Sequence, residues 1–192
     1  MSSDLYAFVF RGLLTEEALD KTGRLRRFGL SAHLDADIAN RLPIDAFDED
    51  LVSRAQRMAV VYVSITAFEN SVREFVSKVL LEKIGADWWT KGVSEKIRTK
   101  AETRREEESK IRWHTPRGDG PINYTEFGDL ASIAGQNWPL FDDYLQSQDW
   151  MRQIISTVER SRNVIMHSGE LGLQDVERIA TAIRDWIRQV GA

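Results

Sequence analysis

The sequence contains no cysteine among its 192 residues. This absence excludes disulfides, thiolate metal sites and cysteine nucleophiles, and it agrees with a reducing cytosol. Long apolar runs are also missing, since no stretch approaches the roughly 18 residues that a membrane-spanning helix needs. The closest stretch, residues 5–14, is broken by Arg11 and follows an acidic start, so it does not fit a signal peptide. We therefore expect a cytoplasmic protein with no membrane partner.

Most short catalytic motifs are absent too. The sequence has no glycine-rich phosphate loop after a strand, no nucleophile elbow and no histidine pair at metal-ligand spacing. We expect neither a metal nor a cofactor. Of the three histidines, His33 and His114 have no obvious partner and are expected to be structural or solvent-exposed, which leaves His167.

Charge is unevenly distributed along the chain. The net charge is −4, and residues 1–50 account for all of it, with ten acidic and six basic side chains. Residues 51–192 carry twenty of each sign and are neutral. A strongly basic nucleic-acid coating protein is therefore disfavoured. A neutral body can still present a local basic patch, so RNA remains a possible partner.

Helical periodicity is found throughout, whereas prolines number four and alternation typical of strands is short. The pattern predicts an all-α fold, an antiparallel helical bundle in residues 48–192, with a helical N-terminal extension in residues 1–47. Asp48 is a candidate N-cap for a long helix that ends near Ile84, before Gly85. Shorter helices are expected over about 93–112, from a Thr125 cap to about Gly135, and from Pro139. Two more are expected over 148–166 and from about 175 to the end.

The long helix carries an apolar stripe with one charged interruption. The stripe contains Val61, Ile65, Phe68, Val72, Phe75 and Val79, widened by Met58, Tyr62, Val76 and Leu80. Glu69 projects into this sector, between Tyr62 and Val76. Because burying an unpaired carboxylate is unfavourable, Glu69 must be paired or lie at a cleft. The last helix has a similar stripe, formed by Val176, Ile179, Ile183, Trp186, Ile187 and Val190.

The helix predicted over residues 93–112 is rich in charges of both signs, and a loop with two prolines and two glycines follows it over 115–123. Two interpretations fit this composition. A solvated face stabilised by pairs four residues apart is favoured over an RNA-binding arm, because mixed charges are typical of exposed helices.

One cluster stands out at the end of the helix over 148–166, where Arg162, Asn163 and His167 precede Ser168 and Gly169. Arginine offers a fixed fork of donors to phosphate, and histidine transfers protons near neutral pH, so the set suits phosphodiester cleavage. Five residues apart on an unbroken helix, Arg162 and His167 would point about 140° apart. They meet only if the helix breaks or if two chains share the site. The alternative is that both residues only interact with the helix C-terminus and its dipole.

The run from Arg162 to His167 resembles the arginine, four-to-six residues, histidine motif of the HEPN superfamily (higher eukaryotes and prokaryotes nucleotide-binding). Further segments are similar to the HEPN branch that is named for a nuclear-pore-associated RNA quality-control endoribonuclease. These are residues 68–75 (FENSVREF), 88–89 (WW), 124–130 (YTEFGDL), 137–141 (NWPLF) and Trp150. The similarity covers about residues 51–190. The tyrosine that follows the motif in some toxin members is replaced by Gly169.

The resemblance implies a homodimer whose two motifs form one composite cleft, and RNA cleavage without a metal. His167 would be the general acid or base, and Arg162 would stabilise the phosphorane. Asn163 would orient the histidine or the phosphate, and Glu69 would hold Arg162 or His167. A toxin or antiviral defence effector with an antitoxin or sensor partner would fit such a domain.

A non-catalytic HEPN-like module for RNA binding, dimerisation or protein interaction remains the alternative. Residues 1–47 bear on both hypotheses, because their acidic excess could cover a basic cleft. Their apolar periodicity, at Leu5, Phe8, Leu13, Leu19, Leu25 and Phe28, favours additional helices of the bundle instead.

Overall fold

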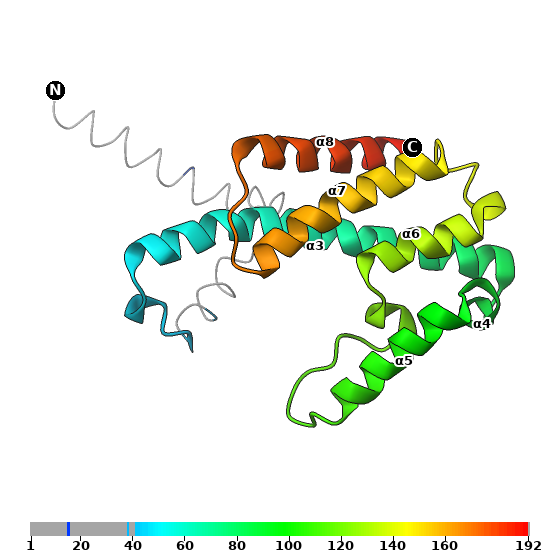
Figure 1. The fold of residues 1–192 in the computed structure, drawn as a ribbon, viewed down its shortest axis with the longest axis horizontal. Coiled ribbons are helices and arrows are strands. Elements are labelled where there is room, and N and C mark those ends of the chain that lie inside the picture. The colour runs from blue at the N-terminus through cyan, green and yellow to red at the C-terminus, as the bar shows by residue number, and fades with distance from the viewer. Residues whose placement is uncertain (1–14, 16–37, 39–40, 192) are drawn as a thin grey trace. The chain divides into compact units, whose positions relative to one another are not determined.

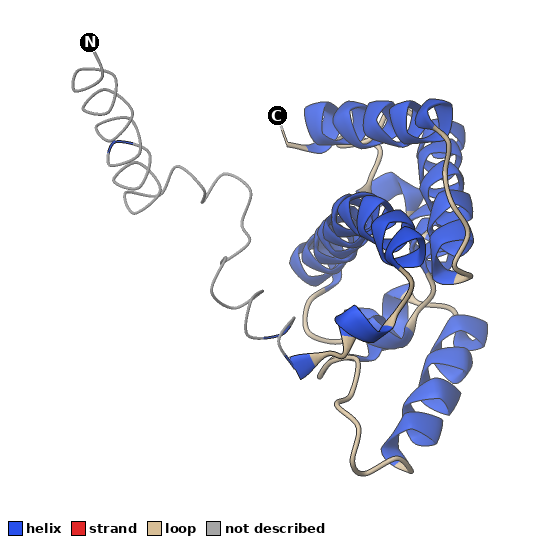
Figure 2. Ribbon diagram, turned by 90° about the vertical axis from the view of Figure 1, so that its left-hand side faces the viewer, coloured by secondary structure: helices blue, strands red, loops and turns tan. Residues whose placement is uncertain are grey.

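The computed structural model describes residues 15, 38 and 41–191 (Figure 1). The helices expected before residue 41 and His33 lie outside the described residues. The chain divides into two units, residues 1–52 and 53–192. Within the described residues every regular element is a helix and none is a strand, which confirms the predicted all-α class (Figure 2).

The longest element is α3, Glu49–Ile84, and local chemistry sets both of its ends. At its start, Asp48 Oδ1 accepts hydrogen bonds from the backbone N–H groups of Asp50 at 3.0 Å and Leu51 at 3.3 Å, as an N-cap does. At its end, Gly85 adopts a φ of +90°, a conformation that stops a helix and favours glycine. The buried side chains of α3 are Ile65, Phe68, Val72, Val76, Val79 and Leu80.

The remaining helices follow the expected order with shifted ends. They are η2 (Ile44–Ala46), α4 (Trp88–Gly92), α5 (Glu95–Ser109), η3 (Pro121–Tyr124), α6 (Phe127–Gln136), η4 (Trp138–Leu140), α7 (Gln148–Met166) and α8 (Leu173–Val190). The prediction that Thr125 caps α6 is wrong. Glu126 is the N-cap residue, because the Thr125 hydroxyl donates to the Ile122 carbonyl at 2.7 Å and closes η3 instead.

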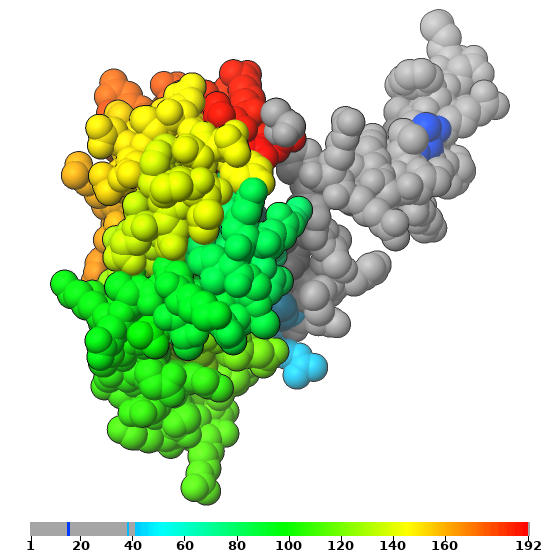
Figure 3. Space-filling view, turned by 90° about the vertical axis from the view of Figure 1, so that its right-hand side faces the viewer, coloured from blue at the N-terminus to red at the C-terminus, as the bar shows by residue number. Residues whose placement is uncertain are grey.

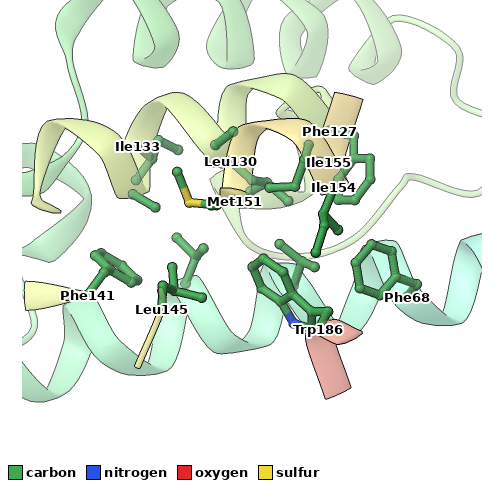
Figure 4. Close-up of a cluster of buried hydrophobic side chains, with 14 of the residues drawn as sticks. Phe68, Phe127, Leu130, Ile133, Phe141, Leu145, Met151, Ile154, Ile155 and Trp186 are labelled. Carbon is green, nitrogen blue, oxygen red and sulfur yellow. The ribbon is translucent and has the colours of Figure 1, made fainter. Parts of the chain in front are cut away.

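The core of the second unit lies where α6, α7 and α8 pack over α3 (Figures 1 and 4). Trp186 of α8 is its hub, 3% exposed, stacked on Trp150 with ring centroids 5.8 Å apart. Its edge contacts with Phe68 at 5.7 Å and Phe75 at 5.9 Å join α8 to α3. Aromatic pairs in such geometries contribute about 1 kcal/mol each beyond the area that they bury.

The apolar stripe predicted on α8 includes a residue at its edge that the structure leaves exposed. Ile179 and Trp186 are buried, but Ile187 is 58% exposed. Ile187 lies about 100° around the helix from Trp186, and α8 packs against the core along one narrow side. Tyr62, at the edge of the α3 stripe, is likewise 40% exposed.

Candidate functional site

Glu69 is the centre of an ion-pair network between α3 and α7. Its side chain is 14% exposed, and each carboxylate oxygen faces one arginine. Arg73 Nη2 lies 2.9 Å from Oε1, and Arg162 Nε lies 3.3 Å from Oε2. The carboxylate that interrupts the apolar stripe is therefore paired twice, which offsets the unfavourable desolvation of a lone charge. The structure brings Glu69 and Arg162 together and does not bring Glu69 to His167.

Arg73 holds the network in place. Besides Glu69, its guanidinium donates to the Ile122 carbonyl through Nε at 3.3 Å and to Asn70 Oδ1 through Nη1 at 2.8 Å. These bonds fix the Glu69 carboxylate and attach α3 to η3. Sequence reasoning gave Arg73 no role, although its position four residues after Glu69 on one helix is a local signal for their pair. Its contact with Ile122 is visible only in the fold.

Part of the Arg162 guanidinium remains available to a ligand. Its side chain is 37% exposed, and Glu69 is its only ionic partner among the described residues. The ion pair is made through Nε, so the two Nη groups have no ionic partner among the described residues and can donate to an anion. A positioned guanidinium with available donors is a suitable phosphate ligand.

His167 is the residue at which α7 ends. Its backbone N–H donates to the Asn163 carbonyl at 3.1 Å, and its side chain is exposed. The next two N–H groups, of Ser168 and Gly169, bond back to Ile165 at 2.9 Å and Val164 at 2.8 Å, the pattern of a Schellman motif. The helix stop expected at this pair is therefore present.

Ser168 occupies the left-handed position of this turn, with a φ of +61°. A residue other than glycine is uncommon there and is destabilised by about 1 kcal/mol or more. Glycine follows it at position 169, where an added Cβ would lie 2.9 Å from the Val164 carbonyl oxygen. The turn that carries His167 is thus tightly determined by its backbone.

The helix does not break between Arg162 and His167, since α7 continues to Met166. Arg162 points toward α3, and no hydrogen bond or ion pair links it to His167 within the described residues. Of the two routes by which they could share a site, a break in the helix is excluded. Asn163 is exposed and lies one turn before His167, on the same side of α7, where it can contact the histidine or its ligand.

The connection between α7 and α8 is attached to the first half of α3. Glu170 pairs with Arg54 at 3.3 Å and with Arg57 at 3.6 Å. The Leu171 N–H points at Met58 Sδ, 3.3 Å away. These contacts join residues more than a hundred positions apart, and no sequence signal indicated them. They attach the segment that follows the His167 turn to α3.

Among the described residues, no group of three or more histidine, aspartate or glutamate side chains is placed to hold a metal ion. No helix in this part of the chain has both the length and the apolar character needed to cross a bilayer.

Comparison with known proteins adds one finding. The profile of a family described as Swt1-like HEPN matches residues 64–191, which include α3 from Ser64 onward, the Glu69 network and the His167 turn. No curated protein and no solved structure matches the chain. The chain therefore belongs to the Swt1-like HEPN family.

Proposed function

We propose that this chain is an endoribonuclease of the HEPN type that cleaves RNA without a metal, at a site assembled from two copies. The observation that carries the proposal is the arrangement of Arg162 and His167 on α7. Arg162 is held by Glu69 through Nε and is still 37% exposed, and His167 is exposed at the helix end, five residues further along the unbroken helix. In a dimer of two antiparallel copies, Arg162 of one copy and His167 of the other would form each site.

The surface beside His167 suits such an assembly. Met166 is 52% exposed and Val164 is 39% exposed, both in the last turn of α7. Exposed apolar side chains next to a polar site are typical of an interface between subunits. A two-fold axis through this turn would bring the two histidines close together.

The reaction needs only the groups that these residues supply. The ribose 2′-oxygen attacks the neighbouring phosphorus, and the bond from phosphorus to the 5′-oxygen breaks. His167 takes the proton of the 2′-hydroxyl and passes it to the leaving 5′-oxygen as the bond from phosphorus to that oxygen breaks. Arg162 donates to the phosphorane oxygens as charge develops on them. The products are a 2′,3′-cyclic phosphate and a 5′-hydroxyl.

Three further residues would position these groups. Glu69 orients Arg162, and Arg73 orients Glu69 through its contacts with Asn70 and Ile122. Asn163 would orient His167 or the phosphate. A role as a toxin or defence effector, restrained by an antitoxin or a sensor protein, is part of the proposal and rests on the family alone.

The test is a cleavage assay on total and transfer RNA in the presence of a chelator. We expect wild type to cleave and to leave cyclic-phosphate ends, and Arg162→Ala and His167→Ala to lose cleavage while they still dimerise. Arg160→Ala is the matched control, since Arg160 is exposed and outside the network. If no substrate is cleaved by wild type, the nuclease proposal is wrong, and the chain is better described as an RNA-binding or dimerisation module.

A further inference from the structure

A basic segment without acidic residues follows α5. From Ser109 to Gly118 the chain carries Lys110, Arg112 and Arg117 with His114, and no aspartate or glutamate. Helix α5 itself is balanced, with five residues of each sign. Positive charge is therefore concentrated in residues 110–117, which we call the basic loop.

Trp113 projects from the basic loop into solvent. It is 86% exposed, whereas the other five tryptophans belong to the core or pack against it. The Trp113 ring makes a T-shaped contact with His114, with centroids 5.6 Å apart, and most of the indole remains open to solvent. Exposing an indole to water is unfavourable, and its burial by a ligand would recover about 2 kcal/mol.

Contacts at both ends hold the basic loop. At its distal end, Arg117 donates its backbone N–H to Glu108 Oε2 at 3.0 Å and its Nε to Oε1 at 3.2 Å. Beyond it, Arg104 Nη1 donates to the Tyr124 carbonyl at 2.9 Å. Residues 111–116 between these anchors form the tip, and the green part of the surface that contains α5 and the loop extends below the rest of the unit (Figure 3).

The base of the basic loop is linked to the proposed active site. Arg73 bonds to the Ile122 carbonyl in η3, at the end of the returning limb, and to Glu69, which holds Arg162. Arg73 and Glu69 thus form a chain of contacts between η3, which follows the basic loop, and Arg162.

We propose that the basic loop binds single-stranded RNA, with Trp113 stacked on an unpaired base and Arg112 and Lys110 on phosphates. The inference rests on the proposed function in so far as RNA is the ligand of the neighbouring site. Aromatic rings flanked by cations are the usual means of holding single strands without sequence readout. A bilayer is disfavoured as the ligand, because Trp113 and Ile111, set between charged neighbours, offer little apolar area to insert.

The test is binding of a fluorescein-labelled oligouridylate with 2′-O-methyl riboses, which cannot be cleaved, followed by anisotropy at several salt concentrations. Trp113→Ala should raise the Kd about tenfold without changing the salt dependence, because stacking involves no charge. Arg112→Gln should lower the slope of log K against log salt by about 0.7, since one phosphate contact is lost. Trp113→Phe should bind nearly as well as wild type.

Control variants come from the far end of α8, where Ile187 and Arg188 are exposed. Ile187→Ala and Arg188→Gln should leave the Kd and the slope unchanged. If wild type cleaves RNA while Trp113→Ala binds and cleaves as wild type does, the inference fails and the proposed function stands. If binding depends on Trp113 but no RNA is cleaved, the inference stands and the nuclease proposal fails. The inference would also be overturned if Trp113→Ala lost binding to phosphatidylserine vesicles and kept its binding to RNA.

Discussion

Arg162 Nε lies 3.3 Å from Glu69 Oε2, and this ion pair joins the end of α7 to the middle of α3. Because Arg73 holds the other carboxylate oxygen, Glu69 cannot turn away without losing a second partner. The side-chain direction of Arg162 is therefore set by two residues that do not belong to the Arg-His motif. This relationship makes Glu69 the residue through which the arginine can be tested without removing it.

We expect Glu69→Gln to lower RNA cleavage at least tenfold and the free energy of unfolding by about 2 kcal/mol, because two guanidinium groups lose their shared counter-charge. Rates on transfer RNA and urea unfolding would measure the two effects. Glu74→Gln is the matched control, an exposed glutamate on the same helix. Unchanged cleavage in Glu69→Gln would remove Glu69 from the proposed site.

A mixing experiment tests whether two copies share the site. Arg162→Ala and His167→Ala are each expected to be inactive. When they are denatured together and refolded, cleavage should return to at most about a quarter of the wild-type rate, since half of the dimers are mixed and one of their two sites is intact. If the mixture stays inactive while both variants dimerise, Arg162 and His167 act within one chain.

The proposed interface can be tested at Met166, which is 52% exposed beside His167. Met166→Glu should weaken self-association at least tenfold and reduce cleavage in parallel, because two like charges would be buried near the two-fold axis. Light scattering coupled to size-exclusion chromatography would report the mass. Ile187→Glu, at an exposed position near the C-terminal end of α8, is expected to leave mass and cleavage unchanged. A dimeric Met166→Glu protein would place the interface elsewhere.

The left-handed turn after His167 predicts a stability difference between two substitutions at Ser168. Valine should destabilise the protein by about 2 kcal/mol, because a β-branched side chain is strongly disfavoured at a φ of +61°. Glycine should be neutral or slightly stabilising, since it adopts this φ freely. Thermal unfolding of the two variants would decide. Equal melting temperatures would mean that the turn does not adopt this conformation in solution.

Glu108 gives the basic loop a pH dependence. The hydrogen bond from the Arg117 backbone N–H, with contributions from the Tyr124 hydroxyl and the Arg117 side chain, holds the pKa of Glu108 below its ordinary value. A lowered pKa stabilises the folded protein above the unfolded-state pKa, and this stabilisation is lost as the pH falls through the folded-state value. Glu108→Gln should therefore lower the Tm at pH 7, with the difference from wild type disappearing in acid. A difference that persists in acid would contradict an ionic role.

Sequence reasoning predicted those features of the fold that depend on neighbouring residues. Asp48 and Gly85 bound α3, and Ser168 and Gly169 end α7, because capping and left-handed turns involve residues only a few positions apart. Contacts between distant segments were missed. Arg73 is an example, since its carbonyl partner belongs to Ile122, and nothing in either local sequence indicates the other.

For the candidate site too, the sequence predicted the local features, and the tertiary structure decided the contacts between distant segments. By itself the sequence determined the all-helical class, the cluster of Arg162, Asn163 and His167 at a helix end, and the need of Glu69 for a partner, because periodicity and desolvation are properties of one segment. Only the tertiary structure decided that the partner is Arg162, that α7 stays unbroken before His167, and that Trp113 is left in solvent. Those outcomes depend on which helix faces pack together, and packing is a property of the whole chain.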